Sequence, residues 1–205
     1  MTEGNVYTAG SEGNLYFCFM KTEFEKMRSE ESYNFKDPEI LSSLNHSKRV
    51  CQMLNQMTLI TPGYRETLEK VIPDIPDDSK VCPPFHCDHG NGIKIGHNVF
   101  VNYNCCFLDG AFIYLGDNVR IGPMCQLYTI SHPLDPILRR STVEIGYPIS
   151  ICEDTWLGGG VIVCPGVTIG KRCIIGAGSV VVHDIPDDCM AAGNPAIIKK
   201  RLNNR

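Results

Sequence analysis

A six-residue interval between apolar residues governs most of this 205-residue chain and restricts its fold more than any other feature. From Leu157 the interval runs without a gap through Val163, Ile169, Ile175 and Val181. An earlier block keeps it on both sides of a two-residue slip, at Ile95, Val101, Phe107, Ile113, Leu115, Ile121 and Leu127. The interval matches neither an α-helix nor an alternating strand. It predicts short strands joined by turns, with three strands closing one triangular coil and successive coils stacking on each other.

A second row of small or β-branched residues follows the apolar row by four positions. Its members are Val99, Cys105, Val119, Cys125, Thr155, Val161, Val167, Cys173 and Ser179. We interpret its three cysteines as compact members of the stack rather than as reactive thiols. The chain has eleven cysteines, an odd number, and its N-terminal residues do not resemble a secretion signal, so we expect reduced thiols.

The repeat is interrupted within LYTISHPLDP, residues 127–136. His132 opens a loop, residues 131–148, and Pro133 and Pro136 stiffen the chain after it. Loops on rigid scaffolds often carry catalytic groups, and an imidazole with an ordinary pKa near 6.5 suits proton transfer near neutral pH. We therefore predict a catalytic role for His132. The slip in the repeat, at residues 108–114, predicts a second, smaller excursion.

The residues before the repeat have a helical pattern. Asp37 can cap a helix that begins at Pro38, and a second helix is expected from Thr61. The apolar positions of the first helix are Leu41, Leu44, Cys51 and Leu54. We divide the chain into a poorly ordered extension (1–22), a helical segment (23–75), the coils (76–190) and a basic tail (191–205).

Composition excludes several classes of partner. A net charge of -4 argues against a surface that follows nucleic acid, and no apolar run is long enough to span a membrane, so we predict a cytoplasmic protein. A metal site is conceivable in CPPFHCDHG, but its Cys82 and Cys87 lack the paired spacing of structural zinc sites even with His86 and His89 nearby. We predict no metal.

Several segments occur in the order found in one family of enzymes. They are EKMRSEESYNFKDPEI, PPFHCDHGNGIKIGHNVFVNYNCCFLD, ISHPLDP, DTWLGGGVIVCPGVTIG and AAGNPA, and together they span about residues 24–202. This arrangement resembles the maltose, galactoside and nodulation-type sugar O-acetyltransferases, whose hexapeptide repeats form a left-handed parallel β-helix. The resemblance implies the same fold, with the N-terminal helical segment on the side of the acetyl acceptor.

The resemblance also implies a reaction. His132 aligns with the catalytic histidine of the family, which acts as general base while a sugar hydroxyl attacks acetyl-coenzyme A directly. A base of this kind contributes roughly 10²- to 10⁴-fold in rate. Glu144 corresponds to a glutamate that many relatives carry near this loop and could orient the imidazole, although an exposed loop acid is an equal reading.

Family positions suggest the binding residues. Asn102 and Asp109 resemble residues that line the acceptor pocket, although both could be turn residues of the coil. Asp37 and Arg49 could reach the acceptor from the helical segment, although for Asp37 helix capping is the stronger reading. The residues expected to hold coenzyme A are Gly159, Ala177, Val182 and His183 along the pantetheine arm and Lys200 at the phosphates.

Three positions depart from the family pattern. Ile197 stands where relatives usually have arginine after the NPA motif, His183 where many have lysine, and His89 where tyrosine is common. The first two changes remove positive charge, so we expect weaker or redistributed binding of the nucleotide.

Two other classes of protein are alternatives to a sugar acetyltransferase. A γ-carbonic-anhydrase-like enzyme would need three converging histidines, whose spacing the six histidines here do not show, and a silent scaffold would not need His132. Within the acetyltransferases, an antibiotic or another hydroxyl acceptor is the alternative substrate. The resemblance implies a homotrimer with active sites between adjacent subunits, which is a closed threefold ring.

Overall fold

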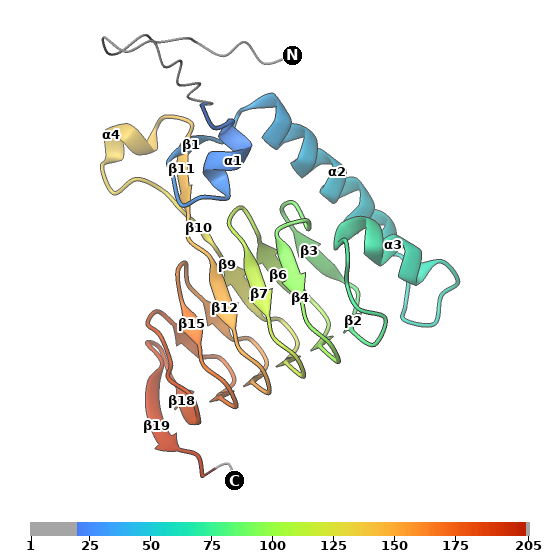
Figure 1. Ribbon diagram of the computed structural model, residues 1–205, viewed down its shortest axis with the longest axis vertical. Coiled ribbons are helices and arrows are strands. Elements are labelled where there is room, and N and C mark those ends of the chain that lie inside the picture. Colours follow the sequence, from blue (N-terminus) through green and yellow to red (C-terminus); the bar gives the residue numbers. More distant parts are fainter. Residues whose placement is uncertain (1–19, 204–205) are drawn as a thin grey trace, which may run out of the picture.

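The computed structural model describes residues 20–203, which form a parallel β-helix with helices packed on one end (Figure 1). The coils expected from the hexads are therefore confirmed. Each full coil contributes one strand to each of three sheets, and strands of one sheet pair in parallel, as in Phe85↔Cys105 and Leu157↔Ile175. The N-terminal extension that we expected to be poorly ordered lies almost wholly outside the described residues.

The strands of each sheet follow the stacking order of the coils. The first sheet contains β2 (Lys80–Val81), β5 (Phe100–Val101), β8 (Arg120–Ile121), β13 (Trp156–Leu157), β16 (Ile174–Ile175), β18 (Cys189–Ala192) and the antiparallel β19 (Ile197–Arg201). The second contains β3 (Phe85–Cys87), β6 (Cys105–Leu108), β9 (Gln126–Tyr128), β14 (Ile162–Val163) and β17 (Val180–Val181). The third contains β4 (Ile93–Ile95), β7 (Ile113–Leu115), β12 (Ile149–Ile151) and β15 (Thr168–Ile169).

The apolar row forms the core of the coils. Val101, Ile121, Leu157 and Ile175 occupy equivalent positions in successive coils and are all buried. Each buried aliphatic side chain stabilises the fold by roughly 1.5–3 kcal/mol relative to an exposed one. Each residue of the apolar row packs on its equivalent in the next coil, so the six-residue interval in the sequence identifies the core residues.

The second row has a more specific role than filling space. Its three cysteines are fully buried, and Cys125 lies with its Sγ 3.2 Å from the carbonyl oxygen of Gly158 in the next coil. Thr155 likewise donates to the carbonyl oxygen of Gly170 at 2.7 Å. A small side chain with a donor satisfies a turn carbonyl that stacking would otherwise bury unpaired.

Two corners of the triangular coil matter for function. The loop corner, between the second and third sheets, consists of residues 88–92, 109–112, 129–148, 164–167 and 182–184. The glycine corner, between the first and second sheets, consists of residues 102–104, 122–125, 158–161 and 176–179. The excursion expected from the slip is the loop-corner segment 109–112, between β6 and β7.

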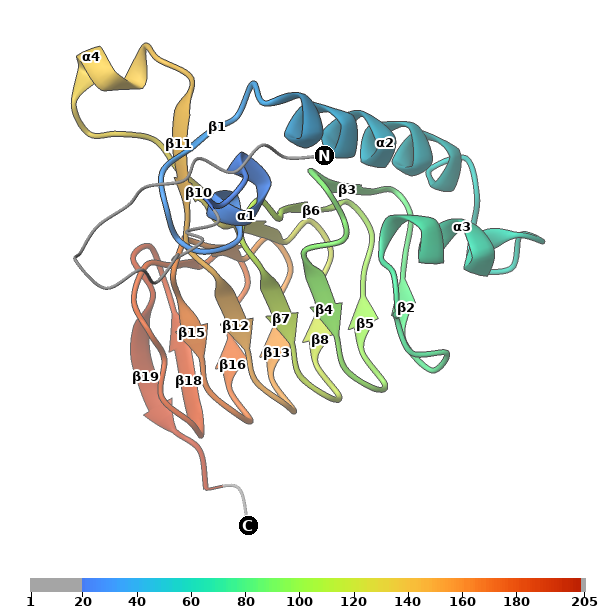
Figure 2. The ribbon, with the colours of Figure 1, turned by 45° about the horizontal axis from the view of Figure 1, so that its top comes forward.

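The N-terminal segment places its long helices over the first coil, beside β2 and β3, and its first residues beside the loop strands β10 (Ile130–Ser131) and β11 (Val143–Gly146) (Figure 2). It comprises α1 (Glu23–Met27), β1 (Tyr33–Asn34), α2 (Pro38–Leu54) and α3 (Tyr64–Val71). The α2 helix begins at Pro38 as predicted, and the Asp37 carboxylate accepts a hydrogen bond from the amide of Glu39 at 2.9 Å. Of the predicted apolar stripe, Cys51 and Leu54 are buried, whereas Leu41 is exposed and Leu44 half-buried.

The predicted start of the second helix is wrong by three residues. Thr61 and Pro62 belong to a turn, in which the amide of Thr61 donates to the carbonyl oxygen of Thr58 at 3.0 Å. Gly63 then adopts a φ of 84°, a left-handed conformation that interrupts the helix before Tyr64. The hydroxyl of Tyr64 donates to the carbonyl oxygen of Val81 at 2.7 Å, which fixes α3 against β2.

The basic C-terminal tail contains a regular strand. β19 (Ile197–Arg201) pairs antiparallel with β18 (Cys189–Ala192) and closes the edge of the first sheet. Within residues 20–203, no helix is both long and apolar enough to cross a membrane.

Candidate active site

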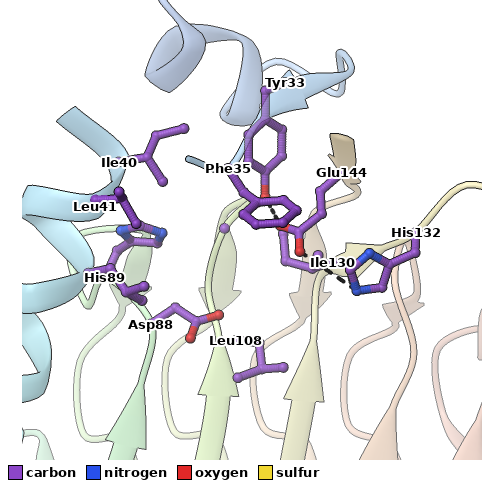
Figure 3. Close-up of a pocket in the computed structure, with 12 residues that line it drawn as sticks. Tyr33, Phe35, Ile40, Leu41, Asp88, His89, Leu108, Ile130, His132 and Glu144 are labelled. Atoms are coloured by element: carbon purple, nitrogen blue, oxygen red, sulfur yellow. Dashed lines mark hydrogen bonds and ion pairs between the residues drawn. The ribbon is translucent and has the colours of Figure 1, made fainter. Parts of the chain in front are cut away.

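A cavity of about 410 Å³ lies at the loop corner, beneath the N-terminal segment (Figure 3). Three successive coils supply its floor through Asp88, Leu108 and Ile130, which follow one another at intervals of 20 and 22 residues. The complete lining is Tyr33, Phe35, Ile40, Leu41, Leu44, Asp88, His89, Leu108, Gly110, Ile130, His132 and Glu144. The helix side of the cavity is apolar, and its polar groups come mainly from the coils and the loop.

The loop is a β-hairpin rather than an irregular excursion. β10 (Ile130–Ser131) pairs antiparallel with β11 (Val143–Gly146), and the short helix α4 (Pro136–Arg139) connects them. The N-terminal strand β1 (Tyr33–Asn34) adds to the other edge of β11, with Tyr33 opposite Glu144. Three backbone segments, one of them distant in sequence from the other two, therefore hold His132 and Glu144 beside each other.

His132, Glu144 and Tyr33 form a chain of polar contacts at the cavity wall (Figure 3). The Nε2 atom of His132 lies 3.7 Å from Oε1 of Glu144, which is an ion-pair distance if the imidazole is protonated. The other carboxylate oxygen, Oε2, accepts a hydrogen bond from the hydroxyl of buried Tyr33 at 2.7 Å. Burial and the Glu144 carboxylate both raise the pKa of Tyr33, so Tyr33 stays a neutral donor.

Asp88 is a second carboxylate in the cavity and was not singled out from sequence. Its carboxyl pKa is raised from 3.8 to about 6, mainly by burial and then by the charges of Asp109 and Glu144. A carboxylate that is costly to ionise can accept hydrogen bonds from hydroxyl groups of a ligand, which would relieve that cost.

His89 lies on the helix side of the cavity and is neutral near pH 7. Burial, followed by the charge of Arg28, lowers its pKa from 6.5 to about 4. Its Nδ1 lies 2.9 Å from the hydroxyl oxygen of Ser43 on α2, and its ring meets Phe24 edge-on. We interpret His89 chiefly as a packing link between the first coil and the helices.

Asp109 lies beneath the cavity and does not line it. Its side chain is completely buried, with Oδ1 accepting from the amide of His89 at 2.8 Å and Oδ2 from the amide of Gly92 at 3.0 Å. The guanidinium of Arg28 donates to the carbonyl oxygens of Asp109 and Gly110. The placement supports a structural role for Asp109, which shapes the segment that carries Asp88 and His89, over direct contact with an acceptor.

The two acceptor candidates from the helical segment also lie outside the cavity lining. Asp37 is occupied as the cap of α2, and Arg49 is exposed farther along the same helix. Asn102 is half-buried on the glycine corner, where its Oδ1 accepts from the amide of Tyr103 at 2.8 Å. Within one chain, none of the three meets His132.

Most candidates for coenzyme A binding map to two corners. Gly159 and exposed Ala177 lie on the glycine corner, where coils approach so closely that a Cβ on neighbouring Gly158 would come within 2.7 Å of the amide nitrogen of Ala177. Val182 and His183 are exposed on the loop corner, two coils beyond the His132 loop. Lys200 is exposed on β19.

The Cys and His side chains of residues 82–89 do not converge on one possible metal site. Cys82 is buried in the first coil, Cys87 contacts α2, His86 is exposed and His89 borders the cavity. In the part of the chain that the structure describes, no three His, Cys, Asp or Glu side chains come together as a possible metal site.

Comparison with known proteins places the chain among acetyltransferases. Residues 148–183 match the bacterial transferase hexapeptide family, described as six repeats. Galactoside O-acetyltransferase of Lactococcus lactis is 33% identical over 183 residues, which cover 88% of each protein. A maltose O-acetyltransferase structure from Clostridium difficile 630 has a TM-score of 0.87 and 38% identity, covering 90% of this chain and 99% of that one.

The chain belongs to the hexapeptide-repeat acetyltransferase family. A further solved member, the acetyltransferase of Vibrio cholerae O1 biovar eltor complexed with acetyl coenzyme A, is 38% identical with a TM-score of 0.84, covering 90% of this chain and all of that one. The predicted family, the left-handed parallel β-helix and an acyltransferase activity are thereby shown.

Two of the three departures from the family pattern fall on the surface. Ile197 on β19 is 57% exposed and His183 is exposed, so neither substitution is explained by packing. His89, by contrast, is 7% exposed and fits its hydrogen bond to Ser43.

Proposed function

We propose that this chain transfers the acetyl group of acetyl-coenzyme A to a hydroxyl group of a sugar, with His132 as general base. The supporting observation is that His132 and Glu144 border one cavity large enough for a sugar ring. The names of the relatives add support, since one is a galactoside and another a maltose O-acetyltransferase. The cytoplasmic location stays a prediction from sequence.

The proposed step is a direct transfer. The imidazole of His132 takes the proton of the acceptor hydroxyl while that oxygen attacks the thioester carbonyl, and the tetrahedral intermediate expels the thiolate of coenzyme A. The imidazolium then returns the proton to the leaving sulfur. Glu144 lies where its carboxylate can stabilise the imidazolium, and Tyr33 holds that carboxylate in position.

The acceptor side suits a neutral, ring-shaped polyol. Ile40, Leu41 and Leu44 line the cavity with apolar side chains that suit the carbon face of a sugar, and Asp88 contributes hydrogen-bond acceptors to the same lining. The same arrangement would also accept the hydroxyl of an antibiotic or another alcohol, which is the alternative substrate class.

A second copy of the chain supplies the donor side in this proposal. Gly159 and Ala177 lie on the glycine corner, whereas His132 lies on the loop corner at the other edge of the second sheet. A homotrimer in which the glycine corner of one subunit faces the loop corner of the next would bring the two sets together, and would bring Asn102 with them.

The test is release of free thiol from acetyl-coenzyme A in the presence of a panel of mono- and disaccharides and of hydroxyl-bearing antibiotics. We expect turnover with at least one sugar and a loss of roughly 10²- to 10⁴-fold in kcat for His132→Ala. The matched control is His46→Ala, an exposed histidine on α2 that does not line the cavity.

Wild-type turnover in His132→Ala would contradict the general-base assignment. Turnover with an antibiotic alone would transfer the proposal to the alternative substrate class.

A further inference from the structure

A pair of thiols joins the helical segment to the first coil. Cys51 of α2 and Cys87 of β3 lie with their Sγ atoms 3.6 Å apart, although they are 36 residues apart in sequence. The hydroxyl oxygen of Ser47 lies 3.2 Å from the sulfur of Cys87 and 4.0 Å from that of Cys51. The two sulfurs are thus close enough to bond after a small movement of either side chain, because a disulfide requires a separation of about 2.05 Å.

This pair is reached from a cavity of its own. A second cavity of about 260 Å³ is lined by Lys48, Cys51, Gln52, Asn55, Gln56, His86 and Cys87. It shares no lining residue with the candidate acceptor cavity. A small oxidant, close to water in size, fits in this volume and would meet both sulfurs.

The two thiols differ in acidity. A hydrogen bond from Cys87 lowers the pKa of Cys51 to about 7 despite its burial, whereas the same contact and burial raise the pKa of Cys87. Burial raises the pKa of three more exposed cysteines, Cys106, Cys152 and Cys164. Near pH 7, part of the Cys51 population is therefore a nucleophilic thiolate, whereas Cys87 keeps its proton beside it.

We propose that Cys51 and Cys87 form a reversible disulfide when the protein meets a hydroperoxide. The Cys51 thiolate attacks one oxygen of hydrogen peroxide and the O–O bond breaks, which leaves a sulfenic acid on Cys51 and a hydroxide that takes a proton from solvent to become water. The Cys87 sulfur then attacks that sulfur and expels its oxygen as a second water. Two thiols are oxidised by two electrons and one peroxide is reduced.

The bond would act on the acceptor side of the site. It would tie α2, which carries Ile40, Leu41 and Leu44 of the cavity wall, to the strand that ends one residue before Asp88. We expect the oxidised protein to change its KM for the acceptor more than its KM for the acetyl donor. This site is separate from the transfer chemistry, so its existence can be tested without an identified acceptor.

The experiment treats the reduced, full-length wild-type protein at pH 7 with a stoichiometric amount of hydrogen peroxide, blocks free thiols with N-ethylmaleimide and maps peptides by mass spectrometry. We expect the first product to be a peptide pair linked through Cys51 and Cys87, reversed by dithiothreitol. Cys51 should be consumed at least about tenfold faster than Cys164. In Cys87→Ser, oxidation should stop at a sulfenic acid on Cys51 that dimedone traps, whereas Cys164→Ser should leave the yield of linked peptide unchanged.

Prior oxidation of Cys106, Cys152 or Cys164, or the absence of the linked peptide, would overturn the proposal. Because the mapping uses wild-type protein, it decides the question even if Cys87→Ser does not fold.

Discussion

At the scale of single residues, the candidate site combines one imidazole with two carboxylates in different environments. Glu144 is held by the hydroxyl of Tyr33 and faces His132, whereas Asp88 is surrounded by other acids and by apolar side chains. Their environments, rather than their residue types, assign them different roles.

The contact between Tyr33 and Glu144 predicts a positioning effect. Tyr33→Phe keeps the ring in the core but removes the donor to Oε2, so Glu144 loses its fixed orientation beside His132. We expect kcat to fall by about 3- to 30-fold with little change in KM for acetyl-coenzyme A, measured by thiol release. Glu144→Gln should lower kcat at least as much, and in that background Tyr33→Phe should have little further effect. Additive losses in the double variant would contradict the shared role.

The raised pKa of Asp88 predicts a pH-dependent cost in stability. Because the folded pKa, about 6, exceeds the ordinary 3.8, the folded state binds the proton more tightly, and stability falls as pH rises from about 4 to 6. Asp88→Asn should therefore raise the free energy of unfolding by about 1–2 kcal/mol at pH 7.5 and by nothing near pH 3.5, measured by thermal unfolding. It should also weaken acceptor binding. An equal gain in stability at both pH values would rule out the ionisation as its source.

The ionisation of His89 changes the stability of the fold in the same pH range, but in the opposite direction. Its folded pKa, about 4, lies below the ordinary 6.5, so its contribution is present above pH 6.5 and is lost as pH falls toward 4. The two effects offset each other in the wild-type curve. The difference between Asp88→Asn and wild type, rather than either curve alone, isolates Asp88.

At the scale of elements, α2 serves both the fold and the cavity. Its first turn is capped by Asp37 and carries Ile40 and Leu41 of the cavity wall, and its last turn carries Cys51. Fraying of α2 would therefore disturb the acceptor side of the cavity while the coils stay folded, because most of their core comes from later residues.

Capping and acceptor binding predict different outcomes at Asp37. Asp37→Ala should lower the free energy of unfolding by about 1 kcal/mol, whereas Asp37→Ser, which can still cap, should lose only a few tenths. If Asp37 only caps, Asp37→Ser keeps the wild-type KM for the acceptor in the thiol-release assay. A large rise in that KM in a stably folded Asp37→Ser protein would instead favour direct contact with the acceptor.

At the scale of the whole molecule, the separation of two corners predicts complementation between subunits. His132→Ala removes the proposed base, and Ala177→Trp places a large side chain on the exposed glycine corner, so each variant alone should be inactive. If active sites form between subunits, co-refolding the two variants should produce some intact sites and recover roughly a tenth to a third of wild-type activity, because mixed rings pair an intact loop corner with an intact glycine corner.

Light scattering should show a trimer for both variants and for wild type. A fully active monomer, or no recovery in mixed trimers, would contradict the intersubunit site.

The sequence by itself determined the coils, their core and the place where they are interrupted. An interval of six leaves one arrangement in which every apolar residue is buried on its equivalent, and His132 stood out because it opens the segment that breaks that interval. The helix start at Pro38 was equally readable, since a capping aspartate followed by proline is a local signal.

Only the tertiary structure decided which residues share the cavity. Asp88 and Leu108 lie together because parallel pairing offsets their coils by 20 residues, and Ile130, two residues beyond the partner of Leu108, joins them where the chain leaves β9 for the loop. Tyr33 reaches Glu144 through pairing of β1 with β11, a contact across 111 residues that has no local signature. Family position indicated Asp109, which is buried beneath the cavity, whereas Asp88 lines the cavity. Local sequence specifies the repeat, whereas the side chains that share the cavity are brought together only when the coils stack and the N-terminal segment packs on them.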